Sequence, residues 1–125
     1  MSHTIPPRAL PQEIRNASGE RIDFTVHPGA ADHDTLVVIG HGVTGNKERP
    51  HLVALAAELA QAGVTVLRLS FSGNGASEGA FTASTITKEV ADLGAVLDAL
   101  PGWRIGYAGH SMGGAVGVLR ASRDP

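Results

Sequence analysis

Apolar residues alternate or cluster in short stretches that predict β-strands. Ile22, Phe24 and Val26 alternate with polar residues, which is the period of a half-buried strand. A short strand around residues 12–16 is expected to pair with residues 22–26 as an antiparallel hairpin across the turn at 17–20. Residues 35–39 form a continuous apolar run rich in β-branched residues, typical of a strand buried on both faces of a parallel sheet. Residues 64–69 and 103–108 predict two further strands.

Between these strands, apolar residues recur at helical spacing. The first predicted helix begins near Pro50 and ends at Gly63, and its apolar positions are Leu52, Leu55, Leu59 and Ala62. The second spans residues 87–100, and its apolar positions are Ile86, Val90, Leu93, Leu97 and Leu100. A third, rich in small residues, spans 112–122. This order of two strands followed by βαβαβα predicts an α/β domain at 12–125 with a mostly parallel sheet. Residues 1–11 hold three of the prolines and are predicted to be an extended arm.

Charge and composition exclude several classes of protein. Ten Lys+Arg against twelve Asp+Glu give a net charge of -2, so we expect neither nucleic-acid binding nor attraction to an anionic membrane. The chain has no cysteine, which excludes disulfides and thiolate sites. No apolar run approaches the ~18 residues that a membrane span needs, and the N-terminus lacks the apolar core of a signal peptide. A soluble, cytoplasmic protein is expected.

The motif Gly-x-Ser-x-Gly occurs twice, at 75–79 and at 109–113. As a nucleophile elbow, the motif needs a strand directly before the serine and a helix directly after it. Ser111 has that context, between the strand at 103–108 and the helix at 112–122. Ser77 lies inside a long loop, so its hydroxyl is expected to satisfy backbone groups there. We therefore predict Ser111 as the nucleophile.

A third glycine motif, Gly-x-Gly-x-x-Gly at 40–45, matches the dinucleotide-binding fingerprint. That fingerprint needs a helix opening among the glycines and an acidic residue ending the next strand. Here residues 46–50 separate the glycines from the helix, and the next strand ends without a carboxylate, so no cofactor is expected. The six histidines show no metal-binding spacing, and most are expected to be solvated loop residues. No metal is expected.

Taken together, the motifs resemble the α/β-hydrolase superfamily, and the chain resembles its N-terminal half from about residue 12 to 122. The matching features are His41-Gly42, the glycine-rich loop at 72–77 and the elbow at 109–114, in the family order. Within the superfamily, segments 42–47 and 71–75 resemble bacterial esterases of the serine-aminopeptidase-like and feruloyl-esterase-like groups. Ser70 departs from the pattern, because relatives usually have Asp there.

This resemblance implies a role for several residues. The backbone N–H groups of Val43 and Met112 would form an oxyanion hole for an acyl-enzyme reaction at Ser111. His110 would pack under the elbow instead of acting as a base. The substrate would be a small-molecule carboxylic ester, with an amide as the alternative.

The triad acid and histidine of such an enzyme follow the serine along the chain. After Ser111 the chain has one acid, Asp124, which comes too early, and no histidine. We expect an N-terminal portion of a hydrolase, inactive by itself. The alternatives are half of a split enzyme, a non-catalytic binding module and, last in order, a dinucleotide-binding domain. The expected partners are a complementing C-terminal half or a second copy, bound through a free edge of the strand at 103–108.

Overall fold

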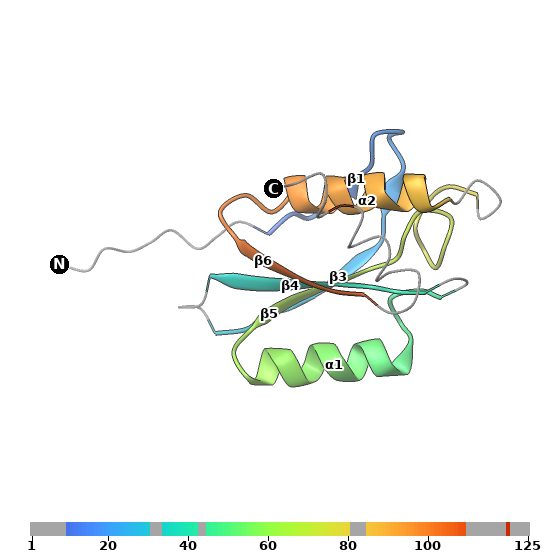
Figure 1. Ribbon diagram of the computed structural model, residues 1–125. Helices are drawn as coiled ribbons and strands as arrows, with labels where there is room; N and C mark the ends of the chain where they lie inside the picture. The colour runs from blue at the N-terminus through green and yellow to red at the C-terminus, as the bar shows by residue number, and fades with distance from the viewer. Residues whose placement is uncertain (1–9, 31–33, 43–44, 81–84, 110–119, 121–125) are drawn as a thin grey trace.

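The computed structural model describes residues 10–30, 34–42, 45–80, 85–109 and 120. In this part of the chain, a four-stranded sheet lies between two helices (Figure 1). Helix α1 (Pro50–Gln61) covers one face, and helix α2 (Ile86–Asp98) covers the other. The result is the layered α/β arrangement that alternating strands and helices predict.

The sheet has the strand order β3-β5-β4-β6. Its strands are β3 (Phe24–His27), β5 (Thr65–Leu69), β4 (Thr35–Gly40) and β6 (Arg104–Gly109). Strand β4 pairs in parallel with both β5 and β6, whereas β3 pairs antiparallel with β5. The predicted fold class, α/β with a mostly parallel sheet, is confirmed.

The N-terminal hairpin differs from the prediction of one strand over residues 22–26. Strand β1 (Ile14–Arg15) pairs antiparallel with β2 (Arg21–Ile22), but the chain then leaves the hairpin and enters the main sheet as β3. The break falls at Asp23, whose backbone N–H donates to Ser77 Oγ and whose carbonyl accepts from the Ser70 N–H. Because the loop after β5 takes up these backbone groups, the chain changes its pairing partner at Asp23, from β1 to β5. The alternation of apolar and polar residues continues unbroken through this change.

Two apolar clusters lie on opposite faces of the sheet. On the α1 side, Leu52 and Ala56 of the helix pack against Ile39 and Val66. On the α2 side, helix residues pack with strand residues and with Ile14 and Ile22 of the hairpin; the buried helix residues are Val90, Leu93 and Val96. The hairpin therefore belongs to the α2 side of the molecule.

The helix predictions are confirmed in extent and corrected in detail. Helix α1 ends before Gly63, whose φ of 98° is the left-handed conformation that glycine adopts readily. Leu55, predicted as a core position, is instead 39% exposed, and Ala56 occupies the core. Of the predicted helix at 112–122, only Arg120 lies among the described residues, and it is helical. In the described part of the chain, neither helix has the length and hydropathy that crossing a bilayer requires.

Candidate active site

The carboxyl ends of the three parallel strands lie at one edge of the sheet, which is where ligands bind in open α/β sheets. At this edge Gly40 of β4 is the register partner of Gly109 of β6. The predicted site residues Val43, Ser111 and Met112 lie outside the described residues. Val43 follows Gly40 by three positions, and Met112 follows Gly109 by three. The structure therefore brings together the two points where these segments leave the sheet.

Gly40 is required here by a close approach of side chains. A Cβ atom at this position would lie 2.0 Å from Tyr107 Oη and 3.2 Å from Phe71 Cζ. Burial, and next the nearby Glu89 carboxylate, raise the pKa of Tyr107 well above its ordinary value. The Tyr107 side chain is therefore neutral, and its hydroxyl end lies against Gly40 at the end of β4.

His41 is a structural residue, with both ring nitrogens engaged. Its Nε2 accepts the Phe71 N–H at 2.9 Å, so Nδ1 carries the proton and donates to the Gly42 carbonyl at 2.7 Å. Burial is the main cause that lowers the pKa of His41, and this side chain is 1% exposed. Most of the histidines were expected to be solvated loop residues, and His41 is not one of these, because it is buried. Because both ring nitrogens are already hydrogen-bonded, His41 has no nitrogen left to act as a base for the predicted nucleophile Ser111.

The loop between β4 and α1 is fixed by hydrogen bonds on both sides of positions 43 and 44. The Gly45 N–H donates to the Gly42 carbonyl at 3.0 Å, which joins the described residues that flank those positions. Farther along, the Lys47 N–H donates to Ser70 Oγ at 3.0 Å. Helix α1 begins only at Pro50, so the glycines at 40–45 do not open a helix as a dinucleotide site requires.

The loop after β5 is fixed by Ser77. Its hydroxyl donates to the Ser70 carbonyl at 2.6 Å and accepts the Asp23 N–H at 2.7 Å. This confirms that Ser77 satisfies backbone groups. Ser70 is fully buried, and its hydroxyl lies so close to Gly75 that a Cβ there would be 2.8 Å away.

A buried carboxylate ties this loop to the hairpin. Asp92 of α2 is 0% exposed; its Oδ2 accepts the Ser72 N–H at 2.8 Å, and its Oδ1 accepts from Asn16 Nδ2 at 2.9 Å. The Asn16 carbonyl oxygen in turn accepts the N–H groups of Ser18 and Glu20 in the hairpin turn. Three segments distant in sequence are thus joined through one side chain.

Sequence reasoning gave no structural role to Asp92 or to a second buried charged residue, Arg68, which is 5% exposed. A signal for each is present in the sequence. Asp92 shares the apolar face of α2 with Val96, and Arg68 interrupts the apolar strand β5. A charged residue at a core position needs partners to offset its desolvation, and so indicates a polar network.

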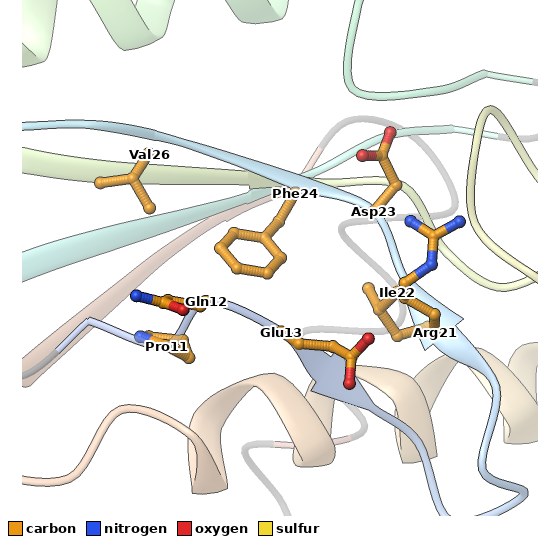
Figure 2. A pocket seen from close by; sticks show the side chains of 8 residues that line it. All are labelled: Pro11, Gln12, Glu13, Arg21, Ile22, Asp23, Phe24 and Val26. Atoms are coloured by element: carbon orange, nitrogen blue, oxygen red, sulfur yellow. The ribbon is translucent and has the colours of Figure 1, made fainter.

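A shallow cleft of about 330 Å³ lies between residues 11–13 and strands β2 and β3 (Figure 2). Phe24 and Val26 point into it, whereas the Asp23 carboxylate points to the other side of the strand and lies 3.4 Å from Lys47 Nζ. Within the described ranges, no group of three His, Asp or Glu side chains is placed to hold a metal ion. The strand edge near Gly40 and Gly109 is the candidate active site, because the segments that carry Val43 and Ser111 leave the sheet there.

Comparisons with known proteins identify the family of the chain. Residues 31–125 match the family model described as serine aminopeptidase, S33. Est1E from Butyrivibrio proteoclasticus, solved with ferulic acid, is 31% identical with a TM-score of 0.81; the match covers 91% of this chain and 48% of Est1E. An α/β-hydrolase from Sphaerobacter thermophilus is 25% identical with a TM-score of 0.74, over 90% of this chain and 40% of that one.

A third structure, XC6422 from Xanthomonas campestris, is described as an α/β serine hydrolase without a lid. It is 23% identical with a TM-score of 0.76, and the match covers 98% of this chain and 59% of XC6422. The chain therefore spans about half the length of these solved structures. No curated protein sequence gives a significant match.

Proposed function

Because the chain belongs to the serine aminopeptidase S33 family, within the α/β-hydrolase superfamily, we propose that it supplies the nucleophile and oxyanion hole of a serine hydrolase. Ser111 is the nucleophile, and the N–H groups of Val43 and Met112 bind the oxyanion. The observation that carries the proposal is the pairing of Gly40 with Gly109. Because of this pairing, the segments that lead to Val43 and to Met112 leave the sheet at adjacent points. These points lie at the edge where open α/β sheets bind ligands.

The reaction is the cleavage of a carboxylic ester through an acyl-enzyme. Ser111 Oγ attacks the carbonyl carbon, its proton passes to a general base, and the carbonyl π electrons become an oxyanion held by the two N–H groups. Collapse of the intermediate expels the alcohol, which takes up that proton. Water then attacks the carbonyl carbon of the acyl-enzyme by the same steps, which releases the carboxylic acid and regenerates the Ser111 hydroxyl.

The base and its carboxylate partner come from outside the described residues. His41 has both nitrogens engaged, and His27 Nε2 accepts from Arg68 Nε at 2.9 Å. Since the chain spans about half the length of its structural relatives, we assign the acid and histidine to the remainder of the complete protein. A complementing C-terminal half on a separate chain is the alternative source.

The substrate class proposed is a small-molecule carboxylic ester. Est1E, which is 31% identical to this chain, was solved with ferulic acid, an aromatic carboxylic acid. A carboxylic acid is the acyl product of ester hydrolysis, and an amide stays the alternative because the matched family is described as serine aminopeptidase. The acyl and alcohol preferences belong to parts of the complete protein that the described residues do not include.

Replacing the nucleophile tests the proposal. In the complete gene product, Ser111→Ala is expected to lower kcat for a p-nitrophenyl ester by at least about 10⁴-fold, because the acyl-enzyme cannot form. Labelling by a fluorophosphonate probe should be lost as well.

Ser77→Ala is the matched control, from the second Gly-x-Ser-x-Gly motif. It deletes a buried hydroxyl with two hydrogen bonds, so we expect a loss of about 1–3 kcal/mol in the free energy of unfolding. Turnover per labelled site should persist. Loss of labelling in Ser77→Ala, with labelling retained in Ser111→Ala, contradicts the assignment.

A further inference from the structure

A cluster of charged and polar side chains lies on the α1 side of the sheet, beside the loop that joins β4 to α1. We call it the Arg68 cluster; its members are Asp23, Thr25, His27, Lys47, Glu48 and Arg68. Arg68 is flanked by the apolar Leu67 and Leu69 in a strand whose residues are all buried. Its side chain is 6% exposed, so its position calls for a physical reason.

The Arg68 guanidinium contacts three groups at once. Nε donates to His27 Nε2 at 2.9 Å, one terminal nitrogen donates to the Lys47 carbonyl, and the same nitrogen lies 3.2 Å from Glu48 Oε1. Two of these groups belong to the β4–α1 loop, and the third belongs to β3. A planar fork of donors can span them, whereas a lysine ammonium is a single point of charge. Arg68 therefore joins the loop to the sheet.

Lys47 forms the other half of this attachment. Its N–H donates to Ser70 Oγ at 3.0 Å, so both backbone polar groups of this loop residue bond to β5 or the residue directly after it. Its ammonium donates to Thr25 Oγ1 at 2.8 Å and lies 3.4 Å from Asp23 Oδ2. The side chain is only 12% exposed. The loop is thus fixed at Lys47 as well as at His41, on either side of residues 43 and 44.

We propose that Arg68 is a positioning residue: acting through Lys47, it holds the β4–α1 loop at a fixed place above the sheet edge, and with it the oxyanion donor on that loop. This inference rests on the proposed function. An oxyanion hole stabilises the transition state because its donors are already in place, and a displacement of about 1 Å can cost roughly 10²-fold in rate. Arg68 is distinct from the nucleophile and the donors, and its effect passes through the loop backbone.

Arg68→Lys tests the proposal in the complete gene product, because it keeps the charge and removes the fork. We expect kcat per fluorophosphonate-titrated site to fall about 10- to 100-fold, with KM changed less than about twofold, since the lost interaction acts in the transition state. Arg104→Lys is the matched control, an exposed arginine on β6. A merely structural role for Arg68 would lower the number of titrated sites and leave kcat per site unchanged.

Hydrogen–deuterium exchange gives a readout independent of activity. In Arg68→Lys the amides of residues 45–48 should exchange about 10-fold faster, while those of β4 and β5 keep their protection. Lys47→Met, which removes the ammonium contacts, should have the same two effects. Lys88→Met is its control, since Lys88 is also part-buried and ion-paired, with Glu20 at 2.8 Å.

Each outcome decides between the two proposals. Faster loop exchange together with the selective fall in kcat supports the positioning role. Unchanged loop exchange in both variants overturns it, as does faster exchange with kcat per site unchanged. If the wild-type protein is not labelled at Ser111, the proposed function fails, and the exchange data alone decide whether Arg68 holds the loop.

Discussion

At the scale of single residues, two histidines make the stability of this domain depend on pH. Burial is the main cause that lowers the pKa of both His41 and His27, from an ordinary value near 6.5. His41 Nε2 accepts the Phe71 N–H, and His27 Nε2 accepts from Arg68. Protonation at either atom removes an acceptor, so the neutral ring belongs to the folded state.

The sign of the pH effect follows from these lowered pKa values. Above pH 6.5 the rings are neutral in both states, and the stabilisation is fully present. As the pH falls below 6.5 the unfolded chain binds protons first, so the free energy of unfolding decreases by about 1.4 kcal/mol for each unit of separation between the two pKa values. The pKa values of Glu20 and Glu48 are also lowered, which adds losses only below about pH 4.5.

We therefore expect thermal unfolding to occur at a lower Tm at pH 5.5 than at pH 7.5. His41→Gln should reduce that difference, because an amide oxygen can accept the Phe71 N–H without titrating. An equal pH dependence in the wild type and in His41→Gln would contradict this assignment.

At the scale of elements, Asp92 joins α2, the loop after β5 and the N-terminal hairpin. Asp92→Ala leaves the Ser72 N–H and Asn16 Nδ2 without their buried acceptor. We expect a loss of about 2–4 kcal/mol in the free energy of unfolding, measured by urea denaturation. Asp98→Ala, at an exposed position on the same helix, should change it by no more than about 0.5 kcal/mol. Comparable effects of the two substitutions would show that the network does not hold these elements together.

The elements also show how far the sequence predicts this structure. The strands and helices with a strong period were predicted to within about two residues, because burial on a fixed face imposes that period. The split at Asp23 was not predictable, since it depends on Ser77, 54 positions away, and local patterning does not report such a contact. For the same reason, Arg68 within an apolar strand indicated a buried polar network, but the sequence could not name its partners, which lie about 20 positions away in the loop at Lys47 and Glu48.

At the scale of the whole molecule, the outer strand β6 has one partner strand, β4, among the described residues. Ile105 on this strand is 37% exposed. Polar backbone groups on an unpaired edge are a template for another chain, and β6 lacks proline and charged residues beyond Arg104 that would blunt it. We expect the purified 125-residue chain to self-associate through this edge as its concentration rises.

Sedimentation velocity of Ile105→Lys tests this expectation, because a charge within an edge strand opposes strand pairing. The variant should sediment as a smaller species than the wild type at the same concentration. Leu55→Lys is the matched control, because it adds the same charge at a side chain that is 39% exposed but lies on helix α1 and not on a strand. If both variants reduce association equally, net charge and not the β6 edge governs it. A wild-type chain that stays monomeric at high concentration contradicts the prediction outright.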